Sequence, residues 1–184
     1  MAIAANIILI ILGSIGLSLA VIRGGWKILR FYTQISNIIA LLSSVLFLLA
    51  GEQTAWLRFV GTCMLIMTFF VSLCILVPMG VGFKKMMLTS SGLYHHTLCP
   101  ILSTVSYVLW EGHASAWYLP VILTFLYGMI MLYLNGKDKV DGPYPFFRVK
   151  QQSALATVVW MAALTGLITL IALAVMWIAK TVGS

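Results

Sequence analysis

Six long apolar runs occupy most of the 184-residue chain, and they restrict its fold more than any other feature. Runs of about 20 apolar residues have the length of helices that cross a lipid bilayer. They are continuous and lack the ten-residue alternation of membrane β-strands. Charged residues make up only 8% of the chain, whereas soluble domains carry roughly 25%. The sequence therefore predicts an all-α, polytopic membrane protein, with six transmembrane helices in one bundle and a single domain over residues 1–184.

The predicted helices alternate with short loops, and two of them have features of their own. The first run has no basic residue ahead of it, so we expect a retained helix rather than a cleaved signal peptide. The fourth run is short, and Pro100 in its first turns removes one helical hydrogen bond. The sequence leaves open whether Pro100 breaks this helix. We predict the spans at residues 3–22, 31–50, 56–78, 95–110, 116–134 and 154–179.

The basic residues are distributed unevenly between the two sides of the predicted bundle. Nine lie in the first, third and fifth loops, and two lie on the other side. Because basic loops stay in the cytoplasm, we expect these three loops to be cytoplasmic and both termini to be outside. Short basic loops also meet lipid headgroups, so the net charge of +7 does not indicate a nucleic-acid partner. The nine residues are Arg23, Lys27, Arg30, Lys84, Lys85, Lys137, Lys139, Arg148 and Lys150, and the two are Arg58 and Lys180.

Two residues suited to proton and acyl transfer begin apolar runs on the predicted cytoplasmic side. Thr33 begins the second run, and His96 begins the fourth. Histidine exchanges protons near neutral pH, and a threonine hydroxyl becomes a nucleophile when a base removes its proton. Since both are expected at one depth in the membrane, the sequence suggests a site in which His96 activates Thr33. The alternative for His96 is a hydrogen-bonded, buried imidazole near the membrane surface.

Each candidate lies on a polar stripe, because residues at +4, +7 and +11 return to nearly the same face of a helix. Lipid cannot satisfy polar groups, so these stripes are expected to face the bundle interior or a cavity. They either bind a ligand there or join helices through hydrogen bonds. The stripes are Thr33, Asn37 and Ser44 on the second helix, and His96, Pro100, Ser103 and Tyr107 on the fourth.

The other histidines and the acidic residues fit this site less well. His95 is rotated by about 100° from His96 on a helix, so the two cannot both face one site. His113 is expected in a solvated loop on the opposite side. The only acids on the cytoplasmic side are Asp138 and Asp141, and Asp141 begins an Asp-Gly-Pro sequence typical of a turn. No acidic residue is expected inside a span, and the outer half of the bundle is expected to be apolar.

No cofactor or metal site is indicated by the sequence. Cys63, Cys74 and Cys99 lie inside apolar runs without a CxxC spacing, which favours free structural thiols. Two adjacent histidines make a poor metal site, and neither a phosphate-binding glycine loop nor a haem motif is present. We therefore expect neither a cofactor nor a metal.

Three short segments, in order along nearly the whole chain, carry a resemblance to a known family. Residues 31–37 (FYTQISN) are similar to an aromatic-aromatic-Thr stretch followed by a small polar pair. Residues 96–100 (HTLCP) are similar to a His-Thr pair with a downstream Pro at the head of a later helix. Residues 143–147 (PYPFF) are similar to a Tyr-Pro-Phe loop before the last helix. Together they resemble the family that includes the androgen-induced gene product and the androgen-dependent TFPI-regulating protein.

The resemblance implies a multi-pass membrane hydrolase with a Thr nucleophile and a His base. The family's eukaryotic members cleave fatty acid esters of hydroxy fatty acids. For this chain it implies Thr33 as the nucleophile and His96 as the general base. The implied partners are the lipid bilayer and a membrane lipid or fatty acyl ester as substrate. The expected substrate-binding residues are Asn37, Gln34, Ser103, Tyr107, Tyr144 and Arg148.

Two other functions stay open from the residues alone. Polar stripes on several helices would also line the path of a transporter, with His96 relaying protons. The expected apolar outer half argues against that function. A lipid-binding protein without chemistry would have a pocket but no contact between Thr33 and His96.

Overall fold

The computed structural model describes residues 1–112, 116–142 and 144–182, and these residues form helices and connections without a strand. The prediction of an all-α chain is therefore confirmed. Helices begin and end within a few residues of the predicted apolar runs, with the fourth segment divided into several pieces. The α-helices are α1 (Ala2–Gly24), α2 (Tyr32–Ala50), α3 (Ala55–Val71), α4 (Cys99–Ser106), α5 (Tyr118–Gly136) and α6 (Ala154–Val182).

Wider, π-helical segments extend α3 and α4. α3 continues as η3 (Ser72–Val81), and α4 lies between η5 (Leu93–Leu98) and η6 (Tyr107–Glu111). Pro100 falls in the first turn of α4, directly after the π-helical turns of η5. Leu98 and Cys99, the two residues before Pro100, both keep right-handed helical φ and ψ, so the helical segment passes through Pro100 without a break.

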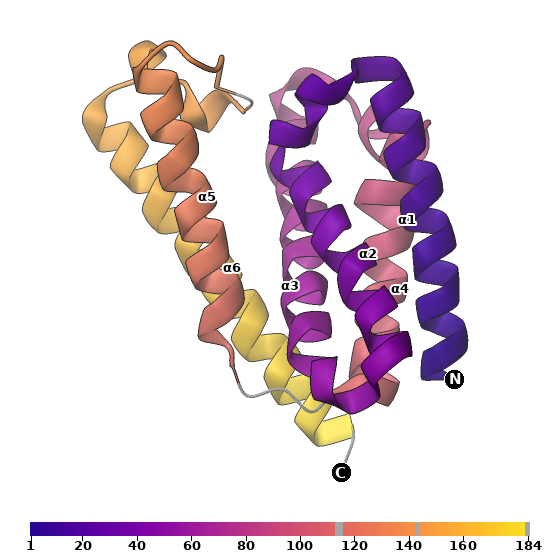
Figure 1. Cartoon of the computed structure of the whole chain (residues 1–184). Coiled ribbons are helices and arrows are strands. Elements are labelled where there is room, and N and C mark those ends of the chain that lie inside the picture. Colours follow the sequence, from indigo (N-terminus) through magenta and orange to yellow (C-terminus); the bar gives the residue numbers. More distant parts are fainter. Residues whose placement is uncertain (113–115, 143, 183–184) are drawn as a thin grey trace.

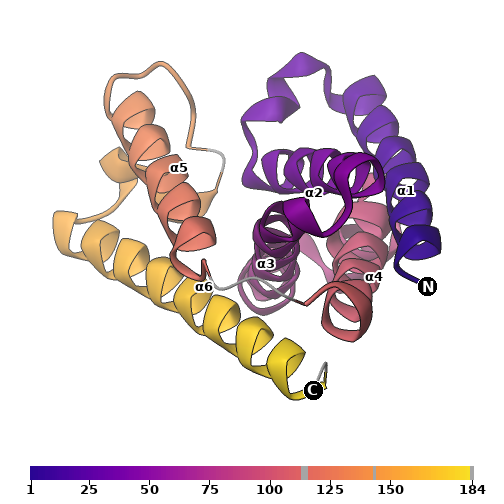
Figure 2. The ribbon, with the colours of Figure 1, turned by 60° about the horizontal axis from the view of Figure 1, so that its bottom comes forward.

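α1 to α4 pack side by side, and α5 and α6 form a hairpin that leans against them (Figure 1). α3 is central, since it contacts α2, α4, α5 and α6. The hairpin approaches the other helices at the start of α5 and the end of α6, and the two helices stand farther away where α5 ends and α6 begins (Figures 1 and 2). The 144–147 segment between them reaches back to the start of α2. The first residues of α1 and the last of α6 lie at the same end of the bundle.

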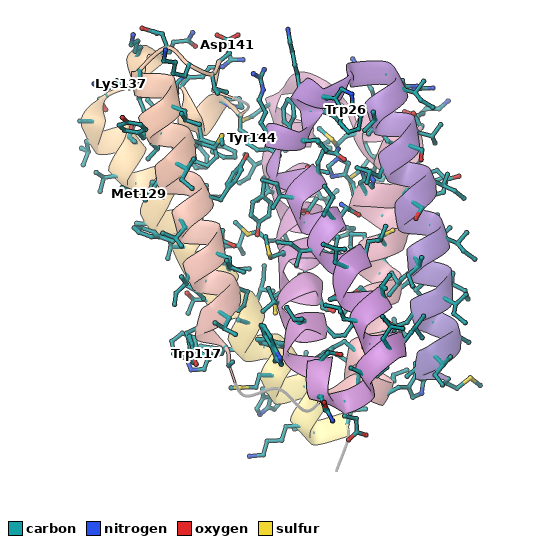
Figure 3. The ribbon with its side chains drawn as sticks, in the orientation of Figure 1. Trp26, Trp117, Met129, Lys137, Asp141 and Tyr144 are labelled. Atoms are coloured by element: carbon teal, nitrogen blue, oxygen red, sulfur yellow. The ribbon has the colours of Figure 1, made fainter. Side chains whose placement is uncertain are left out.

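The two ends of the bundle differ in charge. We call the end formed by connections 25–31, 82–92 and 137–153 the basic end, since these connections carry most of the Lys and Arg residues. Lys137 and Trp26 mark it in Figure 3, and Trp117 marks the opposite end, which we call the far end. The short helical turns in the connections are η1 (Trp26–Arg30), η2 (Gly51–Thr54), η4 (Lys84–Leu88), η7 (Pro145–Phe147) and η8 (Val149–Gln151).

Several helices are candidates to span a membrane. Large apolar side chains such as Ile11, Met129 and Leu170 are exposed on the outside of α1, α5 and α6. An apolar exterior around buried polar groups is the arrangement that lipid requires. One of the long apolar stretches turns back at η2, so it contains both α2 and α3 (Figure 1). The stretches that are long and apolar enough to cross are Ala2–Gly24, Tyr32–Val81, Tyr118–Gly136 and Ala154–Val182.

Close packing of α2 on α3 fixes the position of the first candidate residue. A side chain at Gly61 would place its Cβ 2.9 Å from Ala40 Cα, so the two backbones meet where only glycine fits. Small residues allow such approach between membrane helices. Phe59 and Met64 of α3 are fully buried beside this contact. The start of α2, which holds Thr33, is thereby held on a well-packed pair of helices.

Candidate functional site

An open cavity of ≈ 550 Å³ lies at the basic end, between α1, α2, η3, η5 and the 144–148 segment. Its wall combines polar side chains with apolar ones such as Leu76 and Met86. Several residues singled out from the sequence meet here, although they come from separate parts of the chain. The predicted site residues that line the cavity are Thr33, Gln34, His96, Tyr144 and Arg148.

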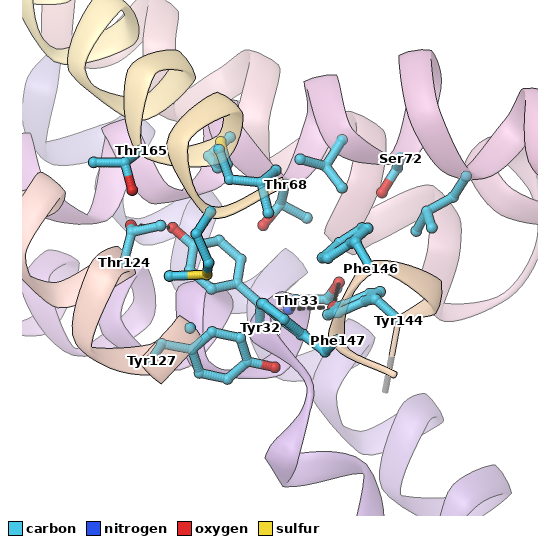
Figure 4. A pocket seen from close by; sticks show the side chains of 16 residues that line it. Tyr32, Thr33, Thr68, Ser72, Thr124, Tyr127, Tyr144, Phe146, Phe147 and Thr165 are labelled. Carbon is cyan, nitrogen blue, oxygen red and sulfur yellow. Dashed lines mark hydrogen bonds between the residues drawn. The ribbon is translucent and has the colours of Figure 1, made fainter. Parts of the chain in front are cut away.

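Thr33 is the second residue of α2 and contacts the phenol of Tyr144. The Thr33 hydroxyl lies 3.3 Å from the Tyr144 hydroxyl, and the Thr33 N–H donates to the same oxygen at 3.3 Å. N–H groups in the first turn of a helix have no carbonyl partner within the helix. The phenol oxygen therefore caps one free donor of α2 while it touches the candidate nucleophile (Figure 4).

Tyr144 is held in place by other aromatic rings. It stacks on Phe146 with centroids 5.2 Å apart and meets Phe31 edge-on at 5.9 Å. Burial of this loop residue raises the pKa of the Tyr144 phenol above its ordinary value. The phenol is therefore neutral near neutral pH, and it can donate a hydrogen bond. Pro143, which precedes it in the motif, lies outside the described residues.

His96 and His95 point to different sides of η5. His96 lines the cavity, and its Nδ1 lies 2.6 Å from the Ser72 hydroxyl of η3. His95 is buried against α1, where a Cβ at Gly16 would lie 2.6 Å from its Nε2. Within the described residues, no hydrogen bond joins Thr33 to His96, since each has another partner. The cavity brings the two residues together without a direct contact.

A second, narrow cleft continues from the cavity into the bundle. Its free volume is ≈ 40 Å³, and it runs between α3 and the α5–α6 hairpin (Figure 4). Most of its lining is apolar, with Met67, Phe147 and Met161 among its residues. Thr33 and Tyr144 line both the cavity and the cleft. The candidate hydroxyl thus lies where a polar, open space meets an apolar, narrow one.

The remaining predicted residues near Thr33 divide into those that face the cavity and one that supports the helix. Gln34 lines the cavity, and its buried Oε1 has no partner. Arg148 lines the cavity together with Arg23 of α1, and both side chains are exposed. Asn37 donates from Nδ2 to the Thr33 carbonyl at 2.8 Å, which holds the first turn of α2. Gln34 and the two arginines are therefore available to a ligand.

Ser103 and Tyr107 lie deeper in the bundle than the cavity. They follow His96 by seven and eleven residues, which at 1.5 Å per residue is roughly 10 and 16 Å along a helix. Ser103 bonds Thr62 at 2.8 Å, and Tyr107 packs on Phe59 with ring centroids 5.7 Å apart. Neither residue lines the cavity or the cleft. The sequence placed them on a polar stripe, and their depth separates them from Thr33 and His96.

A buried ion pair at the far end was missed by the sequence reasoning. Glu111 Oε2 accepts a hydrogen bond from Arg58 Nε at 2.8 Å, and both side chains are fully buried. Its other oxygen accepts from Asn6 Nδ2 at 2.8 Å and from the Ser106 hydroxyl. The fourth predicted span ends at residue 110, so the sequence does not predict that Glu111 is buried. Each charge is tolerated because the other neutralises it and hydrogen bonds surround both.

A signal for this pair was present in the sequence. Arg58 and Glu111 have opposite charges and lie near predicted span ends on the same side, where Asn6 interrupts the first apolar run. Charges at span ends normally reach the headgroups, so this signal alone does not predict that the two residues pair inside the bundle. A separate open pocket of ≈ 350 Å³, lined by Glu52 and Glu111 among others, lies at this end.

The cysteines and histidines form no cluster suited to a metal. In residues 1–112, 116–142 and 144–182, no three His, Cys, Asp or Glu side chains lie close enough to share an ion. The three cysteines are free, and Cys63 and Cys99 are buried. His113 lies outside the described residues, so its predicted role in a loop stays a prediction.

Comparison of the chain with models of known protein families, with curated proteins and with solved structures finds no match. The resemblance drawn from residues 31–37, 96–100 and 143–147 therefore stays a prediction. What the chain itself supplies is one cavity lined by a threonine, a histidine, a tyrosine and two arginines, next to an apolar cleft.

Proposed function

We propose that the chain is a six-span membrane protein that binds a lipid ester at the basic end and hydrolyses it. The basic end faces the cytoplasm, and both termini lie outside. Burial of Arg58 supports this orientation, because it removes one of the two basic residues on the opposite side from the loop charge. Six spans require the 93–111 segment to cross together with α1, α2, α3, α5 and α6.

One observation carries the proposal for hydrolysis. Thr33, His96 and Tyr144 come from three separate segments and line one cavity, and Thr33 and Tyr144 also line the apolar cleft. An amphipathic ester fits such a junction, with a chain directed toward the apolar cleft, its carbonyl beside Thr33 and its polar part in the cavity. Arg23 and Arg148 are suited to hold an anionic group of that ligand. The lipid keeps its chain in apolar surroundings throughout.

The proposed reaction uses Thr33 as the nucleophile and His96 as the base. His96 takes the Thr33 hydroxyl proton, directly or through one water, as the Thr33 oxygen attacks the ester carbonyl carbon. The bond from carbonyl carbon to alcohol oxygen then breaks, and His96 returns the proton to the leaving alcohol. A water then attacks the acyl-threonine while His96 takes a proton from it. The bond from carbonyl carbon to Thr33 oxygen breaks, His96 returns the proton to that oxygen, and the free acid leaves. The long Thr33–Tyr144 contact of 3.3 Å is weak enough to open when the substrate enters.

The negative charge on the carbonyl oxygen needs hydrogen-bond donors. Tyr144 is a neutral phenol 3.3 Å from the Thr33 hydroxyl, and Gln34 offers an amide at the cavity wall. Asn37 already donates to the Thr33 carbonyl, so it has less to offer the substrate. Tyr144 and Gln34 are therefore the donors that we assign to the oxyanion.

The experiment is covalent labelling of the purified protein in detergent with a fluorophosphonate, located by mass spectrometry. We expect an adduct on Thr33 that disappears in Thr33→Ala and in His96→Ala. Thr165→Ala is the matched control, because Thr165 lines the cleft but not the cavity. Hydrolysis of a fatty acid ester of a hydroxy fatty acid is measured on the same variants. Full hydrolysis by folded Thr33→Ala would exclude Thr33 as the nucleophile.

Transport is the second candidate, and the far end gives the observation that favours it. Cavities approach the bundle from both ends, one reaching Thr33 and His96 and the other reaching Glu111. Charged residues inside membrane segments frequently mark ion or substrate paths. Flux of a labelled fatty acid into proteoliposomes that is lost in Glu111→Gln, with no Thr33 adduct in the parent chain, would replace the hydrolase by a transporter.

A further inference from the structure

His96 has a partner that the sequence did not indicate. Its Nδ1 lies 2.6 Å from the hydroxyl of Ser72, a short hydrogen bond between residues 24 positions apart. Ser72 is only 1% exposed, so its hydroxyl is not shared with bulk water. This contact is the one hydrogen bond that the His96 ring makes within the described residues. It fixes the ring orientation from the side away from the open cavity.

The two residues meet because two wide helical turns face each other. Ser72 is the first residue of η3, where α3 widens, and His96 lies inside η5. η4 joins these segments and contacts both of them. π-helical segments are rare in proteins, and they occur frequently at functional sites. Both residues of the Ser72–His96 pair therefore lie in segments that depart from the α-helix.

The two ring nitrogens of His96 have different surroundings. Nδ1 is taken by Ser72, whereas no residue in the described part of the chain makes a hydrogen bond to Nε2. Nε2 of His96 is also not among the buried unpartnered atoms, in contrast to Nε2 of His95. His96 lines the open cavity of ≈ 550 Å³, and Ser72 lines the cleft of ≈ 40 Å³. An ester carbonyl with its two substituents has room beside Nε2 and little room beside the Ser72 hydroxyl.

We propose that Ser72 is the positioning residue of His96: it accepts a hydrogen bond from Nδ1–H and leaves the Nε2 lone pair directed at the cavity. In a neutral imidazole one nitrogen carries the proton, and the hydrogen bond at one nitrogen determines the state of the other. A carboxylate commonly fills this role, but here a buried serine fills it. The role of Ser72 in catalysis rests on the proposed hydrolase function. The predicted tautomer of His96 does not depend on that function.

The tautomer is tested by NMR of the purified protein, labelled with ¹⁵N-histidine in detergent. The signals of His96 are identified by their absence in His96→Gln. We expect a protonated Nδ1 and an unprotonated Nε2 in the parent chain and in Ser72→Thr, and a mixture of tautomers in Ser72→Ala. Ser44→Ala is the matched control, because the buried Ser44 hydroxyl has no hydrogen-bond partner among the residues that the structure describes. An unchanged His96 tautomer in Ser72→Ala would overturn the proposal.

Fluorophosphonate labelling of Thr33 gives the second readout. Loss of an orienting partner typically lowers activity by about 10- to 100-fold. We expect a fall of that size in the labelling rate of Ser72→Ala, recovery in Ser72→Thr and no change in Ser44→Ala. An adduct on Ser72 itself would overturn the positioning role and make Ser72 the nucleophile. If the parent chain labels nowhere but the Nδ1–H tautomer depends on Ser72, the hydrolase proposal fails and the structural assignment of Ser72 holds.

Discussion

The two ends of this bundle both bury polar side chains among apolar helices, but they satisfy them differently. At the far end, Glu111 accepts hydrogen bonds from Arg58, Asn6 and Ser106, so both of its oxygens have donors. At the basic end, Gln34 and Asn37 each retain a buried oxygen without a partner in the described part of the chain, whereas among the far-end residues that hold the paired charges only the Asn6 Oδ1 does so. A cavity of ≈ 550 Å³ opens beside Gln34, and a smaller pocket of ≈ 350 Å³ opens beside Glu111 at the far end.

This difference suggests that the buried polar groups of the far end stabilise the fold, whereas those of the basic end are available to a ligand. In the far-end network the two charges are paired and hydrogen-bonded, and its main effect is to fix the positions of the helices that contribute to it. An unpartnered group beside a cavity has lost water and gained nothing, which costs stability until a ligand or an ordered water bonds it. We therefore expect substitutions to change stability mainly at the far end and chemistry mainly at the basic end.

The largest stability effect is expected from Glu111→Ala. This change leaves the Arg58 charge fully buried without its partner, and breaking a buried pair in this way costs about 3–5 kcal/mol. Chemical unfolding of the detergent-solubilised protein measures the loss. Labelling of Thr33 per folded molecule is expected to stay near the parent value, because Glu111 does not line that cavity.

The double variant Arg58→Met with Glu111→Leu sharpens this test. With both charges removed, no unpaired Arg58 charge remains buried. Most of the stability lost in Glu111→Ala is therefore expected to return. Should Glu111→Ala unfold within about 1 kcal/mol of the parent, the Arg58 charge would have to be hydrated, which requires the pocket beside Glu111 to admit water to the pair. That result would remove the contrast between the two ends.

Features that follow from local patterns could be predicted from the sequence. Apolar runs determine where helices form, and a polar residue at the start of a run lies near one end of the bundle. Thr33 and His96 begin runs on the same side, and they line the same cavity. The separation of His95 from His96 also follows from helix geometry. In the structure His96 lines the cavity, whereas His95 contacts α1 at Gly16.

Features that depend on contacts between distant residues could not be predicted. Thr33 meets Tyr144 across 111 positions, and His96 meets Ser72 through two π-helical turns that no apolar pattern indicates. A helical wheel gives the face on which a residue lies but not whether it lies at the depth of the site. The stripe pattern therefore groups Ser103 with His96, although the two are far apart along the helix. Arg58 was assigned to the surface because a pairing partner on another helix is invisible to a count of loop charges.

Tyr144→Phe is expected to have a smaller effect on stability and a larger one on chemistry. The ring keeps its stacking on Phe146, while the 3.3 Å contacts with Thr33 are lost. A neutral hydrogen bond contributes about 0.5–1.5 kcal/mol, so the free energy of unfolding falls by about 1 kcal/mol or less. Loss of an oxyanion donor lowers hydrolysis by about 100-fold or more. Unfolding and hydrolysis are measured on the same preparation.

The matched control for this variant is Tyr133→Phe, since Tyr133 is 65% exposed on the outside of α5. It removes the same hydroxyl from a position far from the cavity lining, and neither stability nor hydrolysis is expected to change. Equal hydrolysis by Tyr144→Phe and the parent chain would show that the phenol is not a donor to the reaction. The contact with Thr33 would then serve only to cap α2.

The smallest effect is expected from Lys150→Ala, which breaks the ion pair of Lys150 with Asp138 at the surface of the basic end. The two side chains are 57% and 74% exposed, against 0% for both members of the Arg58–Glu111 pair. Exposed pairs contribute about 0.2–1 kcal/mol, and salt screens them. We expect a loss below about 0.5 kcal/mol in chemical unfolding, which vanishes in concentrated salt, while the loss in Glu111→Ala persists there.

A salt-insensitive loss of several kcal/mol in Lys150→Ala would mean that the 137–153 connection is fixed by its charges rather than by the packing of Phe146 and Phe147 against the helices. The position of Tyr144 beside Thr33 would then depend on ionic strength, and the geometry of the basic end would depend on its surface charges.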